Sequence, residues 1–560
     1  MELDTIIIGS GAGGLSAALC LARAGQNVIV LEQHSVPGGW CHSFYLEGHR
    51  FSPGVHYIGM LEEGQSTSNL YRGLGIANDL VFFKMNPKAY EHCWIGDERI
   101  DMPAGYDELF EVLVKRFPHE KKGLAKYLKT VNQVSRELGL IAEMDSFKDN
   151  LTIAYRTRHM GKYGLFNLRR VIDWHIKDPL LKKVLNVQCG DHGLPPSKAS
   201  FPVHCAVMDH YSEGGFYPMG GGASIVKAMT NSIKKYGGEV RTNQSVKRIL
   251  LEGDQKKRAI GVELESGEQI FAKQIISNAD PDQTYLKMIG KSNLSKKLLK
   301  RLSKTKYSCT SLMLFITLDM DVRAAGLDSG NIWMMSDKGE KNLDELYEEM
   351  FVVDLAKGDE FPGLFISCPT LKDPTSFDGY HHTMEIVTFI NYEAFRRFEN
   401  DEGYQSAEYL KYKERLTEKM LNGLEKVLPG VRNHIVQKQL GTPMTNTHYV
   451  NTTDGCVYGT EKSLKQIGPF AFKPKSEFEN LYLCGASIVS HGVAGATYSG
   501  VETAAEILQC KRKDLLKPAE NQHVRVYSAE DHSDFPEWMQ QKIKVRKARA
   551  ESKFEYNVPS

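Results

Sequence analysis

The chain has 560 residues, which is long enough for two or more domains with sizeable cores. Its 70 Lys and Arg residues nearly balance 69 Asp and Glu residues, and the formal net charge of +1 excludes a global electrostatic attraction to nucleic acid. The ten cysteines are scattered without a C-x-x-C pair, which argues against a zinc site and a disulfide framework and favours a reducing compartment.

No stretch of the sequence has the pattern of a targeting or membrane-spanning segment. An apolar strand pattern begins at residue 5, so we expect no signal peptide. No apolar run reaches about 18 residues, roughly the length that crosses a bilayer. We therefore expect a cytoplasmic location and leave peripheral contact with a membrane open.

The first forty residues predict a strand, a tight turn, a helix and a second strand. Residues 6–8 are Ile-Ile-Ile, a short β-branched run that is typical of a buried parallel strand. Residues 15–24 are rich in Ala and Leu and predict a helix that ends at Gly25. Residues 28–31 predict the next parallel strand.

Three glycines join this strand to the helix in the order G-x-G-x-x-G. Gly9 permits the tight turn, Gly11 lets a diphosphate approach the backbone, and Gly14 lets helix and strand pack closely. Glu32 follows the second strand, at the position where a carboxylate accepts hydrogen bonds from the ribose hydroxyls of a dinucleotide. Its negative charge disfavours a ribose 2′-phosphate. We predict a dinucleotide site; the alternative is a tight βαβ turn without a ligand.

A further glycine pair follows the second strand. Gly38 and Gly39 lie six and seven residues after Glu32, and this extension resembles the FAD-binding signature of glutathione-reductase-type flavoproteins. The sequence has no second G-x-G-x-x-G after a strand, so a built-in NAD(P)H domain is not expected.

Beyond residue 40 we expect the following elements in chain order. They are a hairpin around 47–49, short strands and turns over 60–105, charged helices from 106 to about 196, a glycine- and aromatic-rich passage over 201–222 and a helix over 223–236. They continue with strands over 239–240, 245–251 and 259–264, a segment over 274–281 that ends the nucleotide-type unit, strands over 312–318 and 363–367, a helix over 407–428, a strand over 481–485 and a helix over 501–508.

Nucleotide-type segments thus recur with other material between them. The simplest architecture is an α/β fold with a discontinuous Rossmann-type FAD-binding domain and an inserted mixed α+β substrate domain that includes a helical subdomain. We place the first domain at 1–75, 205–290 and 470–515, the second at 76–204 and 291–469, and a polar basic tail at 516–560.

Several narrower motifs carry a resemblance to a known family. They are Gly54-Val-His-Tyr-Ile-Gly59, His210-Tyr-Ser-Glu-Gly-Gly-Phe-Tyr-Pro218, Lys372-Asp-Pro-Thr375 and Gly441-Thr-Pro-Met-Thr-Asn446. Nearly the whole chain resembles the phytoene desaturase and carotenoid isomerase family of FAD-dependent oxidoreductases, and within it the retinol saturase subfamily.

The resemblance implies cofactor roles for matching positions. Adenine, ribose and diphosphate of FAD would contact Gly9, Gly11, Gly14, Glu32, Gly38, Gly39, Val246 and Gly485, and the isoalloxazine would lie beside His491, Gly492, Val493 and Ala494. A helix N-terminus at the last four residues would stabilise negative charge on a reduced flavin. The alternative for residues 481–508 is an ordinary core strand and helix.

The activity that the resemblance implies is hydride transfer from reduced flavin to a C=C bond of an apolar retinoid- or carotenoid-like polyene. The alternatives are a carotenoid desaturase or cis–trans isomerase, and a non-catalytic prenyl- or lipid-binding protein like the GDP-dissociation inhibitors. Trp40 stands where amine oxidases of this superfamily carry a basic residue, which disfavours amine oxidation. External NAD(P)H stays open as the electron donor, as does an unknown redox partner.

Saturation also needs a proton donor that titrates near neutrality. His56, Tyr57 and His491 are the candidates, and each of them is alternatively a hydrogen-bonded packing residue. No metal-ligand spacing is present, so no metal is expected. The basic residues 542–549 of the tail suggest contact with anionic lipid, or alternatively a solvated helix.

Overall fold

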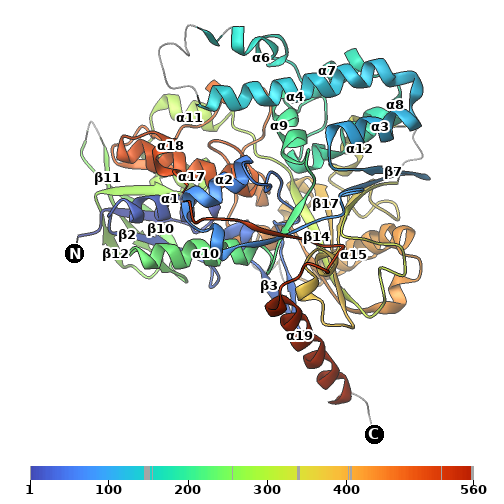
Figure 1. Ribbon diagram of the computed structural model, residues 1–560. Coiled ribbons are helices and arrows are strands. Elements are labelled where there is room, and N and C mark those ends of the chain that lie inside the picture. Colours follow the sequence, from blue (N-terminus) through green and yellow to red (C-terminus); the bar gives the residue numbers. More distant parts are fainter. Residues whose placement is uncertain are drawn as a thin grey trace.

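The computed structural model describes residues 2–143, 152–153, 155–254, 257–336, 341–400, 403, 406–518 and 520–556. One half of the molecule in space is organised around a five-stranded parallel sheet of order β19-β13-β1-β2-β9. Strand β2 of this sheet is labelled in Figure 1. The strands are β1 (Thr5–Ile8), β2 (Val28–Leu31), β9 (Glu239–Arg241), β13 (Gln274–Ser277) and β19 (Leu481–Leu483). They come from the three sequence segments with nucleotide-type patterns, so the discontinuous Rossmann-type fold is confirmed.

Two layers cover this sheet, and the alternation of side chains along β1 separates them. Ile7 packs toward α1 (Ala12–Arg23), α10 (Gly222–Lys235) and α17 (Gly492–Leu508). Ile6 and Ile8 pack on the other side, toward the antiparallel sheet of β10 (Val246–Glu252), β11 (Arg258–Leu264) and β12 (Gln269–Phe271). Both faces are buried, which is why the strand is a continuous apolar run.

The second half is built on a seven-stranded mixed sheet of order β18-β14-β17-β16-β15-β6-β7. Its strands are β6 (Glu91–Ile95), β7 (Glu98–Met102), β14 (Thr310–Leu318), β15 (Asn331–Met335), β16 (Gly363–Ser367), β17 (His382–Ile390) and β18 (Ile435–Gly441). One face packs on α15 (Ala407–Val427) in a core that includes Leu314 and Ile386. The opposite face belongs to a second core shared with the helical layer.

That helical layer lies at the top of the molecule in Figure 1. Its helices are α3 (Tyr106–Arg116), α4 (Lys121–Glu143), α6 (Arg158–Tyr163), α7 (Leu168–His175), α8 (Pro179–Leu185) and α9 (Phe201–His210). The predicted charged helices after residue 106 are confirmed. Other α-helices of the described residues are α2 (Ser66–Leu74), α11 (Lys296–Leu302), α12 (Leu343–Met350) and α16 (Pro443–Val450).

A small three-stranded sheet joins the C-terminal residues to the body of the protein. β20 (Arg525–Ser528) pairs in parallel with β5 (Val81–Lys84), which pairs antiparallel with β8 (Phe216–Pro218). Phe535 and Met539 are buried against this sheet. The described part of this C-terminal segment is therefore not only a solvated tail, and α19 (Glu537–Tyr556) projects from the body (Figure 1).

Several expected elements differ from the structure at their ends or in kind. α1 and α17 begin at Ala12 and Gly492, earlier than expected, because glycines adopt the first helical turn there without a side chain to signal it. The passage after residue 201 begins with α9, and the strands and turns expected over 60–105 include α2. β3 (Phe44–Leu46) and β4 (His49–Phe51) confirm the hairpin. The proposed domain boundaries stay a prediction.

Among the helices that the structure describes, none combines the length and the apolar character that crossing a bilayer requires.

Candidate active site

One cavity of about 1150 Å³ connects the two halves of the molecule. At one end it is lined by the residues that follow β1, β2 and β13, at the carboxyl edge of the parallel sheet. At the other end it is lined by the free face of the seven-stranded sheet and by the helical layer. Ordinary small-molecule sites have volumes of about 300–1,000 Å³. This cavity is slightly larger, so it has room for a cofactor and a substrate together.

The glycine turn after β1 is shaped by close backbone contacts. A Cβ on Gly14 would lie 2.1 Å from the carbonyl oxygen of Gly9, so only glycine permits this packing of helix on strand. A Cβ on Gly11 would lie 2.7 Å from Nδ2 of Asn278, which crosses over from β13. Gly9 has a φ of +89°, which favours glycine. Gly9 and Gly11 line the cavity, whereas Gly14 acts behind it through packing.

Glu32 is held at the edge of this turn. Its Oε2 accepts hydrogen bonds from the Ser10 backbone N–H at 2.9 Å and from Ser10 Oγ at 2.5 Å. Its Oε1 accepts the backbone N–H of His34 at 2.9 Å. A carboxylate accepts about four hydrogen bonds, so one acceptor position is left for a ligand in the cavity that Glu32 lines.

The other predicted cofactor residues lie around the same cavity. Lining it are Gly38, Gly39, Val246, Gly485, Gly492, Val493 and Ala494. Two helix N-termini, those of α1 and α17, reach the cavity, and neither has a side-chain cap. Their first-turn N–H groups thus remain available for negatively charged groups of a ligand.

Three buried polar atoms at the cavity wall have no hydrogen-bond partner within the described residues. They are Nε1 of Trp40, Oγ1 of Thr67 and Nδ1 of His491. Buried polar atoms are normally paired, so each orphan atom points to a ligand with complementary groups. Together with the glycine turns and the two uncapped helices, these atoms fit a dinucleotide such as the predicted FAD.

The far end of the cavity is apolar. The free sheet face contributes side chains from β14, β15, β16 and β17, namely Met313, Trp333, Phe365, Val387 and Phe389. The helical layer contributes Leu138, Met160, Leu165, Val203, Ala206 and Val207. None of these side chains carries a charge, so this end of the cavity suits an elongated hydrocarbon.

His56 lies in the cavity wall between the two ends. Its Nδ1 is 2.9 Å from Oε2 of Glu385, and its ring centroid is 5.2 Å from that of Phe365. The backbone carbonyl of His56 accepts a hydrogen bond from Nζ of Lys372 at 2.8 Å. Burial lowers the pKa of Lys372 to about 7, so the ammonium group beside the site is close to losing its proton at neutral pH.

Tyr57 is also in the wall and takes part in a buried polar cluster. Its Oη lies 2.5 Å from Oε1 of Glu91 and 2.8 Å from Oδ2 of Asp191. Its ring stacks on Tyr211 with centroids 4.1 Å apart. Burial raises the pKa of Tyr57 well above its usual value, and the two carboxyl groups raise it further. The phenol therefore stays protonated at neutral pH.

His491 occupies the position before the first residue of α17, at the same wall, and its side chain does not cap the helix. Its Nε2 donates a hydrogen bond to the backbone carbonyl of Asp191 at 2.8 Å. Burial lowers the pKa of His491 to about 3, so the ring is neutral at pH 7. The structure thus places the three candidates from the sequence, His56, Tyr57 and His491, in one cavity wall. Their catalytic roles stay a prediction.

Sequence reasoning missed several residues of the wall. Asn278 stands between the two glycine turns and lines the cavity. A signal for it existed, because it directly follows a parallel strand at the edge where ligands bind. Asp191 and Trp333 had no such signal, because each lies in a segment whose neighbours in space are distant in sequence.

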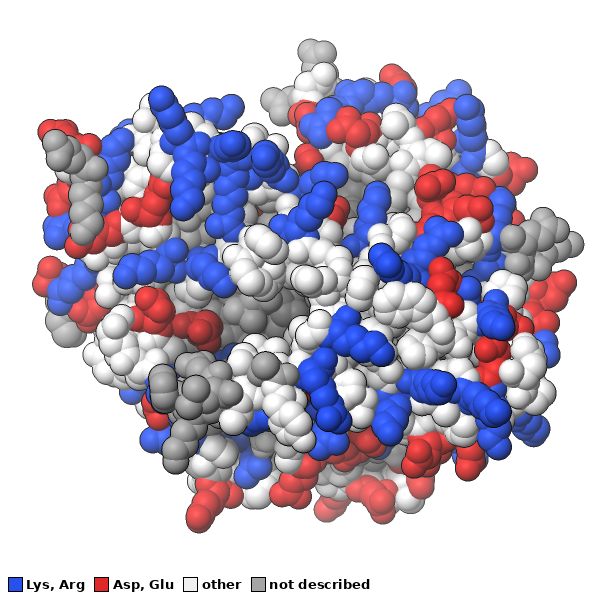
Figure 2. All heavy atoms as spheres, turned by 90° about the horizontal axis from the view of Figure 1, so that it is seen from above, with Lys and Arg blue, Asp and Glu red and all other residues white. Residues whose placement is uncertain are grey.

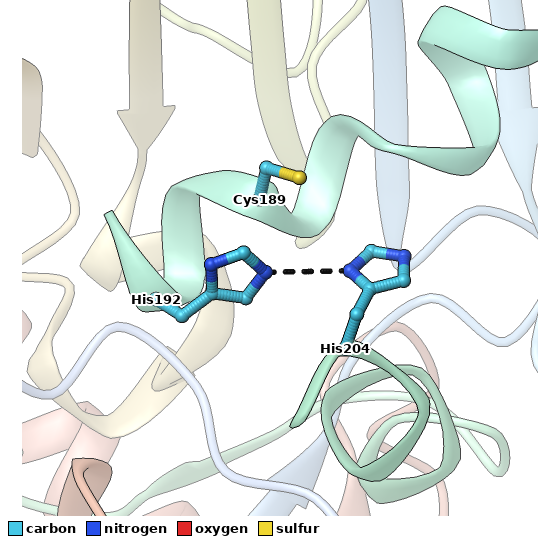
Figure 3. A group of neighbouring side chains, drawn as sticks. All are labelled: Cys189, His192 and His204. Carbon is cyan, nitrogen blue, oxygen red and sulfur yellow. Dashed lines mark hydrogen bonds between the residues drawn. The ribbon is translucent and has the colours of Figure 1, made fainter. Parts of the chain in front are cut away.

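A separate cluster of Cys189, His192 and His204 lies in the helical layer (Figure 3). The three ligand atoms lie within 4.8 Å of one another, and all three residues are buried. His204 Nε2 bonds to the Leu185 carbonyl at 3.2 Å, and its Nδ1 faces His192 Nε2 at 3.4 Å. The two imidazoles contact each other, whereas Nδ1 of His192 has no hydrogen-bond partner within the described residues, and we assign no metal to the cluster.

Comparison with known proteins gives consistent relationships. The chain is 29% identical over 530 residues to the all-trans-retinol 13,14-reductase of Danio rerio, covering 90% of this chain and 86% of that protein. It is 27% identical over 528 residues to the chloroplastic prolycopene isomerase of Daucus carota, covering 90% of this chain and 80% of that protein. A solved oxidoreductase from Methanosarcina mazei shares the fold, with a TM-score of 0.58 at 17% identity, over 90% of this chain and 100% of that chain.

Residues 12–310 match the family described as flavin containing amine oxidoreductase, which is more than half of the chain. The match begins within the glycine turn, at the first residue of α1, and spans α1 and β13 at the cofactor end and the helical layer at the other end. Fold, cavity and similarity agree, and the chain belongs to the flavin containing amine oxidoreductase family.

Proposed function

We propose that the protein is an FAD-dependent oxidoreductase that saturates one C=C bond of an apolar polyene of retinoid or carotenoid type. The observation that carries the proposal is the single cavity, with backbone glycines and helix N-termini at one end and uncharged side chains at the other. A substrate at the apolar end would lie against whatever occupies the glycine end. The 29% identity to a protein named all-trans-retinol 13,14-reductase supports the reaction type.

The proposed cofactor contacts follow the cavity wall. Adenine, ribose and diphosphate would contact Gly9, Gly11, Glu32, Gly38, Gly39, Val246 and Gly485, supported by the packing of Gly14, and the isoalloxazine would lie beside His491, Gly492, Val493 and Ala494. A bound flavin supplies hydride transfer to or from carbon. The uncapped N-terminus of α17 would stabilise negative charge on its reduced form.

The chain itself has to exclude water, hold the polyene and supply a proton. The apolar wall formed by the free sheet face does the first two, because it offers no hydrogen-bonding group to water along most of its length. We propose that His56, Tyr57 and His491 line the reacting end of this wall. Their partners within the protein, described above, hold their rings in place.

A second candidate function is cis–trans isomerisation of a carotenoid. It is favoured by the 27% identity to a protein named prolycopene isomerase and requires the same cavity. The two reactions differ in their product, because saturation adds two hydrogens and isomerisation adds none. Desaturation would remove two hydrogens and would need oxidised flavin.

Anaerobic product analysis tests the proposal. The purified flavoprotein, chemically reduced, is incubated with all-trans-retinol or with a poly-cis lycopene, and the extracted product is analysed by mass spectrometry and chromatography. We expect a gain of two hydrogens and bleaching of one polyene double bond. A product of unchanged mass but altered retention favours isomerisation, and a purified protein that cannot bind FAD contradicts both and points to a lipid-binding protein.

We propose that reducing equivalents come from outside the chain, from NAD(P)H or from a protein partner. The sequence lacks a second G-x-G-x-x-G that would bind a nicotinamide dinucleotide. Anaerobic mixing with NADH or NADPH decides between the two sources. Rapid bleaching of the flavin absorbance supports a nicotinamide donor, and unchanged absorbance supports a protein partner.

We also propose peripheral contact with an anionic membrane around the apolar mouth of the cavity, in place of the basic tail suggested by the sequence. Two cavity-lining side chains are largely exposed, Leu165 at 82% and Phe470 at 63%. Basic residues adjoin both, because Arg170 lies over Phe166 and Arg301 donates to the carbonyl of Phe470.

The surface around α4, α6 and α7 has the corresponding charge. Figure 2 shows Lys and Arg side chains gathered around a hollow on the face seen from above. Exposed basic residues in these helices include Lys122, Lys126, Lys129, Arg158, Lys162 and Arg169. An apolar rim beside basic side chains is the arrangement that binds anionic lipid surfaces, from which a polyene would enter the cavity.

A further inference from the structure

A buried carboxyl group and a half-buried one share one phenol at the cavity wall. Tyr57 Oη lies 2.5 Å from Oε1 of Glu91 and 2.8 Å from Oδ2 of Asp191. Glu91 is fully buried on β6, behind the wall, whereas Asp191 lines the cavity. The phenol thus connects a carboxyl group inside the protein with one that faces the substrate space.

The number of hydrogens in this cluster is limited. A phenol has one O–H, so Tyr57 donates to only one of the two carboxyl oxygens. The phenol oxygen lies 2.5 Å from one carboxyl oxygen and 2.8 Å from the other, and two oxygens this close repel each other unless a hydrogen lies between them. The carboxyl group that does not accept the phenol hydrogen must therefore supply a hydrogen of its own. One of the two carboxyl groups must therefore be protonated and must donate to Tyr57.

The remaining partners decide which group carries the proton. Glu91 also accepts hydrogen bonds from Nε1 of Trp333 at 2.9 Å and from Nε2 of Gln188 at 3.2 Å, and both stabilise a carboxylate. Within the described residues, the side chain of Asp191 has a hydrogen bond only with Tyr57. Its carboxyl group is therefore much less able to bear a charge at this half-buried position.

The electrostatic surroundings agree with this assignment. Burial raises the pKa of Asp191 well above its usual range, and the charge of Glu91 raises it further. Burial also raises the pKa of Glu91, to about 7, but its three hydrogen bonds and the charge of Lys372 act in the opposite direction. Lys372 is thus the cation that favours an ionised Glu91.

We propose that Asp191 is held as a neutral carboxylic acid at the cavity wall and donates its proton to the polyene carbon adjacent to the one that receives the hydride. Tyr57 and Glu91 are positioning residues, since they hold the acid through the phenol bridge. The inference rests on the proposed reductase function. It also names a residue that the sequence did not single out.

Alternative donors in the wall are less suited. His491 is neutral and bonds to the backbone carbonyl of Asp191 through its one N–H; loss of that proton would leave an imidazolate anion, which is far less stable than a carboxylate. That bond also fixes Asp191 beside the N-terminus of α17, where the isoalloxazine is proposed to lie. His56 directs Nδ1 to Glu385. Asp191 is the carboxylic acid that both lines the cavity and holds a proton to give.

The step balances in atoms and charge. The O–H bond of Asp191 breaks, and its hydrogen forms a C–H bond at one alkene carbon. The other alkene carbon receives a hydride from the reduced flavin, which is thereby oxidised by two electrons. Asp191 is left as a carboxylate, with Tyr57 between two anions, and recovers its proton from water after the saturated product leaves.

Infrared spectroscopy tests where the proton resides, independently of turnover. A protonated carboxylic acid has a C=O stretch that is separate from the amide bands and moves in D₂O. In the flavin-free and the flavin-bound protein we expect this band in the wild type and in Glu91→Gln, and its loss in Asp191→Asn. A band that persists in Asp191→Asn and disappears in Glu91→Gln overturns the assignment.

Turnover tests the donor role. Asp191→Asn preserves size and still donates a hydrogen bond to Tyr57, but it supplies no acid proton. We expect its rate of saturation to fall by about 10²- to 10⁴-fold with unchanged flavin content, as for loss of a general acid. Glu91→Gln is the matched variant and should lose less than about tenfold. In D₂O the wild-type product should carry one solvent deuterium.

The outcomes separate this inference from the proposed function. If wild type and Asp191→Asn saturate the polyene at rates within about twofold, the donor role is wrong and the reductase function stands. If the wild type saturates no polyene, the donor role falls together with the proposed function, and the infrared band still decides whether Asp191 is protonated. Tyr57→Phe should shift the frequency of that band, which a purely structural role would not do.

Discussion

The two ends of the cavity are built in different ways. The cofactor end is formed mainly by backbone, from glycine turns at residues 9–14, 38–39 and 485 and from two uncapped helix N-termini. The substrate end is formed by side chains from four strands and several helices. A backbone-built site needs particular residue types at short spacing, whereas a side-chain-built site needs only apolar residues of suitable size at distant positions.

This difference predicts different tolerance to mutation. At the cofactor end, one added methyl group meets protein atoms at less than 3 Å, as at Gly11 and Gly14. At the substrate end, the side chains border open volume, so a larger residue enters the cavity without a clash. We therefore expect mutations at the cofactor end to abolish flavin binding and mutations at the substrate end to change which polyenes are accepted or how fast they react.

The largest effect is expected for Gly11→Val. The Cβ would lie 2.7 Å from Asn278 Nδ2, and the branched side chain would occupy the space that a diphosphate needs. The purified variant should retain no measurable flavin by absorbance. Gly139→Val is the control, because no atom lies within 4 Å of its Cβ position on α4 and it should keep its flavin. A yellow Gly11→Val with the wild-type spectrum would contradict the assignment.

The next largest effect is expected for Val387→Trp at the substrate end. Val387 lines the cavity on β17, and an indole there would shorten the space for a polyene. We expect kcat/KM for the polyene to fall by about tenfold or more, the equivalent of about 1.4 kcal/mol, with full flavin content.

Its neighbour Ile386 supplies the control for that experiment. Ile386 faces the opposite core beneath α15, so Ile386→Val should cost only about 0.5–1.5 kcal/mol of stability and leave kcat/KM unchanged. Equal losses of kcat/KM in both variants would mean that the cavity face of β17 has no special part in substrate binding.

An effect of comparable size concerns acid stability, to which the helical layer over the substrate end should contribute. Burial lowers the pKa of His204 to about 4, below the ordinary value of 6.5. The unfolded chain then binds the proton first, so stability is full above about pH 6.5 and declines as the pH falls toward about 4, by about 1.4 kcal/mol per pH unit.

Urea unfolding of His204→Gln measures this contribution. Between about pH 6.5 and about pH 5 the wild type should lose roughly 2 kcal/mol more of its free energy of unfolding than the variant loses. His192 contacts His204, which helps to lower its pKa, so the difference reports the acid response of the histidine pair. An identical pH response of the two proteins would show that His204 titrates normally.

The smallest effect is expected at the mouth of the cavity. Leu165→Glu should reduce flotation with vesicles of phosphatidylcholine and phosphatidylglycerol by a few fold, about 1 kcal/mol, through lost apolar burial and added negative charge. Leu410→Glu on α15 is the matched control, since Leu410 is 54% exposed and does not line the cavity. Equal binding of both variants, or binding to pure phosphatidylcholine alone, would argue against the proposed contact.

Prediction from sequence succeeded where the signal was local. β1, β2 and the G-x-G-x-x-G turn follow from residues within one stretch, and Glu32 follows from its spacing to that turn. α2 was missed because its polar sequence, Ser-Thr-Ser-Asn, lacks an apolar repeat at its start. Asp191 was missed because its importance depends on Tyr57 and Glu91, which lie 134 and 100 positions away along the chain.

The amino-acid sequence by itself determined the dinucleotide turn and the alternation of nucleotide-type with inserted segments, because glycine sterics and apolar periodicity act over a few neighbouring residues. Only the tertiary structure decided which side chains share the cavity and how many hydrogens the Tyr57 cluster holds. Such facts depend on distances between elements that the packing of two sheets and a helical layer brings together, and on burial, which no single stretch of residues encodes.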